Sequence, residues 1–256
     1  MDVALFITCL TDTFEPGVGV AVVRVLRHFG CRVHFPSAQT CCGQAHYNNG
    51  YHAAAAALGR RMVDIFEPYP YVVTPSGSCA AMVRLHTPGL LADDPCYAAR
   101  AQALADKTWE FGQFLLNVLH ADPKALPRGA DGPVTYHYSC HLRHLQTPEE
   151  GVRLVSELPG IDFRPLERID QCCGFGGAFH VLYPDISDAM TGDKLDCIAR
   201  TGARTVVCNE AGCGMTLGGA ARRRGLNVTF RHVAELWAER LGTLDVTPHP
   251  PREVCA

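Results

Sequence analysis

The chain has 256 residues, of which 47% are hydrophobic and 19% are charged, and its formal net charge is −3. This length fits one large domain or two of ordinary size, and the composition is typical of a globular protein rather than a disordered or fibrous one. The slight acidic excess argues against a nucleic-acid-binding protein, because such proteins present a basic stripe.

In the first half of the chain, apolar β-prone segments alternate with helical segments. We expect strands at 3–9, 31–35 and 70–74, and helices at 17–29 and 50–67. The stretch 96–120 is also predicted to be helical. Prolines and glycines between 121 and 132 then indicate a boundary between two domains, the first of which spans 1–125.

The second half, 133–242, shows the same alternation. We expect strands at 134–140, 161–166 and 204–208, and helices at 149–158, 184–201 and 232–241. Residues 243–256 contain three prolines and are predicted to form a loose tail. Strands that alternate with helices predict an α/β fold with parallel sheets.

The cysteines repeat in the same order in both halves. Cys9 corresponds to Cys140, and the Cys41-Cys42-Gly43 motif corresponds to Cys172-Cys173-Gly174. The shift is 131 residues in each case (140 − 9 and 172 − 41). Cys79 corresponds to Cys213 at a shift of 134 residues (213 − 79). This order indicates an internal duplication, so we expect two βαβ-type parallel-sheet halves related by a pseudo-two-fold axis.

Thirteen cysteines need an explanation in a chain of this kind. The apolar start at 3–10 lacks the basic flank and cleavage site of a signal peptide, and no apolar run approaches the length of a membrane span. We therefore expect a cytoplasmic protein without a membrane span, in a compartment that keeps thiols reduced. There, many cysteines indicate metal binding or redox chemistry rather than disulfides.

The topology predicts that these cysteines gather into two sets of four. Ligands of parallel α/β sheets collect at the carboxyl ends of the strands, and the repeated cysteines fall at or just after those ends. The predicted metal ligands are Cys9, Cys41, Cys42 and Cys79 in the first half, and Cys140, Cys172, Cys173 and Cys213 in the second.

Four thiolates suit either an iron–sulfur cluster or zinc. Adjacent cysteines diverge, so both bind one tetrahedral ion only with strain, whereas a wider cluster offers them separate irons; this favours up to two iron–sulfur clusters, taken as [4Fe-4S]. Zinc and a vicinal redox disulfide are the alternatives. The glycines that follow each pair, Gly43, Gly174, Gly176 and Gly177, are predicted to let backbone N–H groups approach the cluster sulfurs, or else to shape a tight turn.

Several further residues are candidates of lower weight. Cys208 lies five residues before Cys213 and is left open as a ligand, whereas Cys255 falls in the tail. His46 and His141 lie beside the predicted sites, either as hydrogen-bond donors or proton carriers or as ordinary loop residues. Three cysteines without a counterpart in the other half are expected to be small apolar core residues: Cys31, Cys96 and Cys197.

Taken together, the motifs resemble the cysteine-rich CCG-domain proteins and, most closely, the lactate utilization protein A family. The similar stretches are 5–10 (LFITCL), 40–44 (TCCGQ), 73–80 (VTPSGSCA), 139–142 (SCHL), 172–177 (CCGFGG) and 211–213 (AGC). The resemblance implies an iron–sulfur subunit of an oxidoreductase that acts with two sibling proteins, B and C, in the oxidation of L-lactate to pyruvate. Similar domains occur in heterodisulfide reductase and in the iron–sulfur subunit of glycolate oxidase, which implies a flavin or another cluster protein as neighbour.

The chain departs from the reductase-type domain at one point. That domain carries a fifth cysteine three residues after the fourth, but here these positions hold Met82 and Thr216. Three functional hypotheses remain open: an electron-transfer subunit, a catalytic cluster protein that binds a thiol or hydroxy acid at an open iron site, and a zinc-stabilised scaffold without redox activity.

Overall fold

The computed structural model describes residues 1–129, 132–145 and 148–243, so the predicted tail beyond Thr243 lies outside the described residues. The first half forms β1 (Asp2–Leu5), α1 (Cys9–Phe14), α2 (Pro16–His28), β2 (Arg32–His34), α3 (Gln44–Asn48), α4 (His52–Phe66), β3 (Val72–Thr74), α5 (Gly77–Ala81), the π-helix η1 (Met82–His86), α6 (Thr87–Leu90), α7 (Ala98–Lys107), β4 (Thr108–Glu110) and α8 (Phe111–Asn117).

The second half repeats this order with fewer helices. It forms the 3₁₀ helix η2 (Pro123–Ala125), β5 (Pro133–His137), the 3₁₀ helix η3 (Cys140–His144), α9 (Pro148–Ser156), β6 (Asp162–Phe163), α10 (Ala178–Leu182), α11 (Pro184–Thr201), β7 (Thr205–Cys208), α12 (Ala211–Arg223), β8 (Thr229–His232) and α13 (Val233–Arg240).

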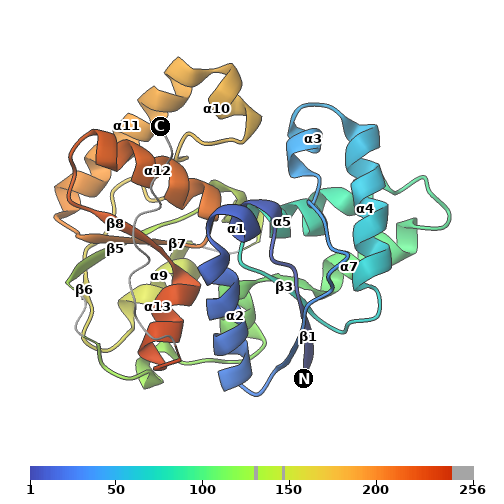
Figure 1. Cartoon of the computed structure of the whole chain (residues 1–256), viewed down its shortest axis with the longest axis horizontal. Coiled ribbons are helices and arrows are strands. Elements are labelled where there is room, and N and C mark those ends of the chain that lie inside the picture. Colours follow the sequence, from blue (N-terminus) through green and yellow to red (C-terminus); the bar gives the residue numbers. More distant parts are fainter. Residues whose placement is uncertain (130–131, 146–147, 244–256) are drawn as a thin grey trace.

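The strands form two four-stranded sheets in which every paired neighbour runs parallel. The first sheet has the order β2-β1-β3-β4 and the second has the order β6-β5-β7-β8, so corresponding strands take corresponding positions (Figure 1). The predicted α/β fold with two duplicated parallel-sheet halves is therefore confirmed.

Each sheet has one strand more than the sequence predicted. β4 lies inside the stretch 96–120, which was wrongly predicted to be helical throughout, and β8 precedes the predicted helix at 232–241. Both are edge strands, of three and four residues. Segments this short do not display a two-residue period, so pairing with β3 and β7 is what defines them.

The central strands end earlier than predicted. β1 ends at Leu5 and β5 ends at His137, so Cys9 and Cys140 begin α1 and η3 instead of closing the strands. A second difference is α3, a short helix directly after Gly43 that the predicted helix at 50–67 did not include. These changes leave the cysteines at the carboxyl ends of the strands.

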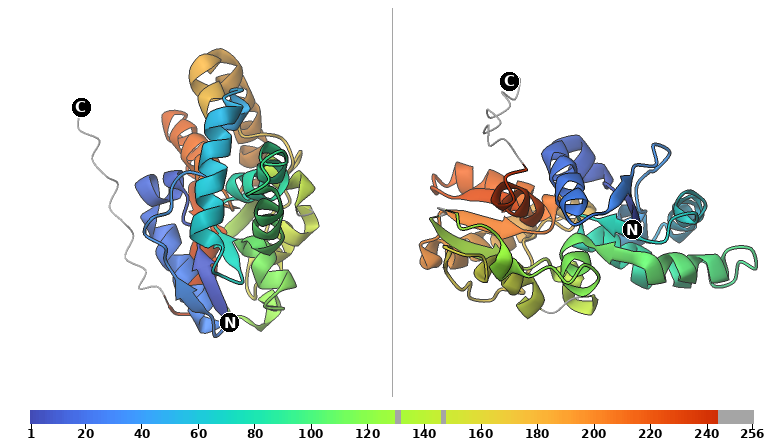
Figure 2. Two further views of the ribbon diagram at one scale, coloured as in Figure 1. Left: turned by 90° about the vertical axis from the view of Figure 1, so that its right-hand side faces the viewer. Right: turned by 90° about the horizontal axis from the view of Figure 1, so that it is seen from below.

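The two halves share one core. α2 of the first half packs against α13 of the second between the two sheets (Figure 2). The ring centroids of Phe29 and Trp237 lie 6.4 Å apart at this junction, and the Trp237 indole N–H donates to the carbonyl of Leu154. A buried indole with a satisfied N–H stabilises such a junction, so the halves are held in one relative position. Within the described residues, no helix combines the length and apolarity needed to cross a membrane.

Candidate metal centres

The four cysteines predicted for the first half lie together at the carboxyl ends of the first sheet. Cys9 is at the start of α1, Cys41 and Cys42 lie in the loop after β2, and Cys79 lies in α5. The sulfurs of Cys9 and Cys41 are 3.8 Å apart, and those of Cys42 and Cys79 are 3.3 Å apart. Three separate segments of the chain thus bring their thiols to one place.

The second half repeats the arrangement. The sulfurs of Cys140 and Cys172 are 3.9 Å apart, and those of Cys173 and Cys213 are 3.0 Å apart. Cys213 lies in the first turn of α12, as Cys79 lies in α5. The structure therefore assembles both predicted sets of four thiols, and their assignment as metal ligands stays a prediction.

The pKa of the central thiol is lowered in the same way in both sets. Hydrogen bonds from Cys42 and then Cys9 lower the pKa of Cys41 to about 2, while the pKa of Cys9 and that of Cys42 are raised, each chiefly by its interaction with Cys41. In the second half, bonds from Cys140 and then Cys173 lower the pKa of Cys172 to about 2. One thiolate per half is therefore held by its neighbours' S–H groups.

This asymmetry predicts which thiols react first in the reduced, metal-free protein. At about pH 6 we expect iodoacetamide to modify Cys41 and Cys172 ahead of the other six thiols of the two sets, because the thiolate is the nucleophile. A lowered pKa keeps the thiolate as the pH falls, whereas a raised pKa delays it to alkaline pH. Peptide mass spectrometry after timed quenching measures the order. Faster modification of Cys9, which is more exposed than Cys41, would contradict the assignment.

The glycines of the two loops have the conformations that only glycine adopts readily. Gly43 and Gly174 both have φ of +89°, and each donates its N–H to the sulfur two residues earlier, at 3.4 Å from Cys41 and from Cys172 respectively. Gly176 and Gly177 also have positive φ and line the cavity described below. The predicted approach of N–H groups to sulfur is thus present at Gly43 and Gly174.

Buried polar atoms without a partner among the described residues lie next to the cysteines in both halves. They include the hydroxyls of Thr40 and Ser139, the side-chain carbonyl of Gln171 and both ring nitrogens of His137. Unpaired buried polar atoms cost free energy, and native proteins satisfy nearly all of them. Sulfur donors together with these atoms fit a site that takes up a charged, polar group such as a metal cluster.

His137 is a site residue that the sequence analysis missed. It ends β5 and is fully buried, and one of its ring nitrogens lies within 4.8 Å of the sulfurs of Cys173 and Cys213. Burial, and then the charge of Lys194, lower the pKa of His137 to about 3, so the imidazole is neutral. The available signal was a histidine in a buried strand three residues before Cys140.

The other sequence candidates fall into three groups. His141 Nδ1 lies 3.7 Å from the sulfur of Cys140, whereas His46 is exposed on α3. Cys31 and Cys197 are buried, as expected for core residues. Cys96 is exposed, so its predicted place in the core is wrong; it follows Pro95 in a surface turn between α6 and α7.

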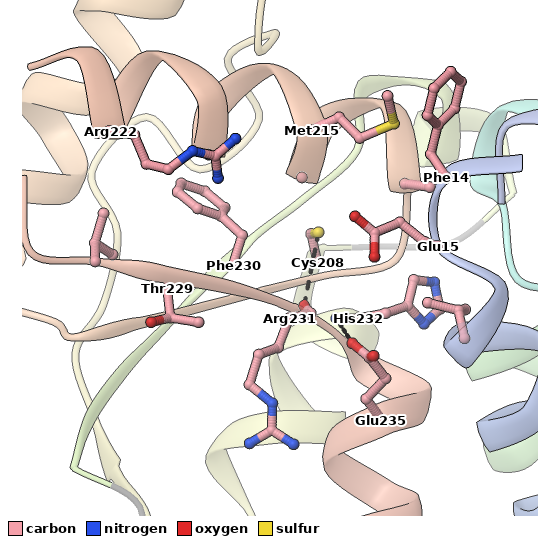
Figure 3. Close-up of a pocket in the computed structure, with 15 residues that line it drawn as sticks. Phe14, Glu15, Cys208, Met215, Arg222, Thr229, Phe230, Arg231, His232 and Glu235 are labelled. Atoms are coloured by element: carbon pink, nitrogen blue, oxygen red, sulfur yellow. Dashed lines mark hydrogen bonds between the residues drawn. The ribbon is translucent and has the colours of Figure 1, made fainter. Parts of the chain in front are cut away.

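Cys208 lies against backbone carbonyl groups. Its sulfur contacts the carbonyl oxygens of Glu210 and Arg231 at 3.6 and 3.8 Å. It lines a different cavity, of about 510 Å³, between the start of α2, α12 and β8 (Figure 3). The lining of that cavity includes the ring of Phe230 and the charged groups of Arg222 and Glu235. Cys208 is therefore not part of either set of four.

A single cavity of about 320 Å³ connects the two sets. All eight predicted ligands line it, together with residues of α3 and α10 and the side chains of Ser76, Ser78, His141 and Glu210. Figure 1 shows α3 and α10 on the same side of the molecule, on either side of α1 and α5. The two centres therefore face each other across a space that a small molecule could enter.

Hydrogen bonds join the halves directly between the two sets. The carboxylate of Glu210, at the start of α12, accepts from the Ser76 hydroxyl and the Ser78 N–H, both at 2.9 Å. The Ser76 hydroxyl in turn accepts from the N–H of Cys79. Glu210 thus caps the helix that carries a thiol of the other half, which fixes the position of Cys79 relative to Cys213.

A second acidic residue, Glu110, is buried at the same junction. Glu110 is the N-cap residue of α8, and its carboxylate accepts a hydrogen bond from the N–H of Gln113 at 3.1 Å. Burial raises its pKa from 4.5 to about 7, and the N–H groups of Gly112 and Gln113 offset only part of that effect. The folded protein therefore holds a proton at Glu110 that the unfolded chain releases at lower pH.

This raised pKa predicts a pH dependence of stability. The folded protein binds the Glu110 proton more tightly than the unfolded chain does, so this proton stabilises the fold. The stabilisation is complete below pH 4.5 and is lost as the pH rises through about 7. At pH 8 we expect Glu110→Gln to raise the free energy of unfolding by up to about 3 kcal/mol, with no such gain at pH 4.5. Denaturant titrations of both proteins across this range measure it. An equal difference at both pH values would contradict the account.

One family of known proteins matches the chain twice. The CCG cysteine-rich domain family matches residues 3–84 and 134–218, one match in each half. A crystal structure of a hypothetical protein from Helicobacter pylori has a similar fold, with a TM-score of 0.67 and 8% identity, over 95% of this chain and 49% of that one. The chain thus spans about half of that protein, and the likeness concerns the fold alone.

Curated relatives match the chain from end to end. Lactate utilization protein A of Bacillus cereus is 44% identical over 243 residues, which cover 94% of this chain and 100% of the relative. The protein of the same name from Bacillus licheniformis is 42% identical over 241 residues, with the same coverage. The chain therefore belongs to the lactate utilization protein A family and contains two matches to the CCG cysteine-rich domain.

Proposed function

We propose that each half holds an iron–sulfur cluster, of the [4Fe-4S] type, and that the chain is the electron-transfer subunit of a cytoplasmic complex that oxidises L-lactate to pyruvate. The observation that carries this proposal is the convergence of two sets of four thiols on one cavity, each set containing an adjacent Cys-Cys pair. Structural zinc sites favour a gap of two to four residues between paired cysteines, whereas a cluster presents separate irons to adjacent sulfurs.

The two sets of cysteines would hold the clusters: Cys9, Cys41, Cys42 and Cys79 in the first half, and Cys140, Cys172, Cys173 and Cys213 in the second. A bound cluster of this kind accepts and releases single electrons. The protein's contribution is to hold the thiolates in place and to surround them with N–H groups. Gly43 and Gly174 each direct a backbone N–H at a ligand sulfur, which stabilises negative charge there.

Lactate enters the proposal through the relatives. The chain covers the full length of proteins named lactate utilization protein A, so the activity of those proteins is a reasonable assignment for it. The sequence contains no dinucleotide-binding glycine fingerprint, so a hydride acceptor, where the reaction needs one, is supplied by another chain. We assign that role to the sibling proteins B and C, or to an equivalent flavin or iron–sulfur subunit.

A second function is favoured by the cavity itself. Its volume of about 320 Å³ is at the lower end of small-molecule sites, and both sets of sulfurs open into it. A cluster bound by only three of the four thiols in a set would leave one iron open to a ligand from this cavity. A catalytic role, in which a thiol or a hydroxy acid binds such an iron, is therefore the alternative.

The test uses anaerobically purified chain, alone and with its siblings. Electron transfer predicts that lactate reduces the clusters only when the siblings are present, as followed by electron paramagnetic resonance. A lactate-induced change in the spectrum of the isolated, chemically reduced chain would favour the catalytic role. Colourless protein containing zinc and no labile sulfide would contradict both and leave the zinc-stabilised scaffold.

A further inference from the structure

The two centres differ at one buried position beside the thiols. In the second half, the imidazole of His137 lies next to Cys173 and Cys213, with one ring nitrogen within 4.8 Å of both sulfurs. All three residues are buried. Imidazole nitrogen and thiolate sulfur are both ligands that iron accepts, so these three side chains together form a set of possible ligands.

The first half has no nitrogen at this position. Leu5 pairs with Val73 in the first sheet and Tyr136 pairs with Val207 in the second, so the residue after each, Phe6 and His137, correspond. Phe6 is buried and packs edge-on against Phe66, with ring centroids 5.6 Å apart. The same strand end therefore offers a hydrocarbon to one centre and an imidazole to the other.

The imidazole of His137 has no other partner. Neither ring nitrogen forms a hydrogen bond with any described residue, although the side chain is fully buried. An ordinary core histidine is satisfied, as His232 is by the carbonyl of Pro75 and the N–H of Ala234. A buried, unpartnered imidazole beside two thiols is thus explained by a ligand that binds at the thiols.

A buried positive charge lies close to the second set of thiols. Lys194 is buried in α11, and its ammonium donates to the carbonyls of Arg168 and Ile169. It interacts electrostatically with Cys173 and Cys213. The corresponding helix of the first half, α4, contains no lysine, and its Arg60 and Arg61 bind the carboxylate of Asp94 and the carbonyl of Ala38. The surroundings of the second centre therefore stabilise added negative charge more than those of the first.

We propose that the imidazole of His137 is a ligand of the second centre, in addition to its cysteines, and that the two centres are consequently unequal. This inference rests on the proposed function, because it assigns a ligand to the same cluster. The buried ammonium of Lys194 favours the negative charge that a cluster gains on reduction. The second centre is therefore the one that is reduced first, so electrons entering at the first half come to rest in the second.

The test measures nitrogen coupling to the cluster. Anaerobic protein labelled with ¹⁵N-histidine is reduced partially and studied by pulsed electron paramagnetic resonance. We expect a strong histidine-nitrogen coupling in the centre that is reduced first. His137→Phe, which copies the first half, should abolish this coupling. The smaller variant His137→Ala serves if the phenylalanine does not fold, with added imidazole expected to restore the coupling.

His141→Phe is the matched control, since His141 also lies beside a predicted ligand of this half but belongs to η3 instead of β5. The His141→Phe variant should keep the strong coupling. Iron clusters without any histidine coupling, or a coupling that survives in both His137 variants, would overturn this inference alone. Absence of iron and labile sulfide from the protein would overturn the proposed function and this inference with it.

Discussion

Replacing Cys173 by serine is expected to remove the metal of the second half and to spare that of the first. Cys173 is buried, and its sulfur lies 3.0 Å from that of Cys213, so a serine hydroxyl would leave the set without its innermost thiolate. We expect the iron content to fall from about eight to about four atoms per chain, because the centres are built from separate segments. Iron and acid-labile sulfide assays on anaerobic protein measure the loss.

Cys208→Ala is the control for this variant. Cys208 is an equally buried cysteine of the same half, but its sulfur faces backbone carbonyls and a separate cavity. The variant should retain all of the iron. Cys42→Ser should mirror Cys173→Ser by removing the metal of the first half instead. Full iron content in either serine variant would contradict the ligand sets.

Gly174→Ala is expected to be the most destabilising change in the second cysteine loop. A Cβ at this position would lie 2.5 Å from the carbonyl oxygen of Ser187 and 2.6 Å from the hydroxyl of Thr191. Those groups cannot move freely, because the two hydroxyls hold the loop through bonds to the carbonyls of Gly174 and Cys173. We expect a loss of about 3 kcal/mol or more, from the clash added to the left-handed backbone conformation.

Gly43→Ala isolates the backbone effect. Gly43 has the same φ of +89°, but a Cβ there meets only ordinary contacts at 3.4 Å with Ala55 and Leu58. We expect a loss of about 1–2 kcal/mol, the cost of a left-handed non-glycine residue. Denaturant unfolding of both variants in metal-free form compares the two. Equal losses at the two positions would show that the contacts with α11 do not restrict the loop.

The duplication and the thiol sets were predictable because they rest on order and spacing along the chain. Cysteines at strand ends must meet in a parallel sheet wherever the strands stop. The early ends of β1 and β5 therefore did not disturb the sets, although Cys9 and Cys140 start helices. β4 and β8 were not predictable in this way, because strands of three and four residues carry too few side chains to show a period.

His137 escaped prediction for a different physical reason. The counterpart of His137 in the first half is Phe6. A ligand present in only one half has no repeat to reveal it. Likewise, the hydrogen bond from the Ser76 hydroxyl to the Glu210 carboxylate joins residues 134 positions apart and became visible only in the structure.

The most direct measurement is the iron and acid-labile sulfide content of the anaerobically purified chain. Two [4Fe-4S] clusters predict about eight iron atoms and about eight sulfides per chain, with a brown colour that air bleaches. Two equivalents of zinc with no sulfide would contradict the account, since the same eight cysteines would then hold two closed structural ions.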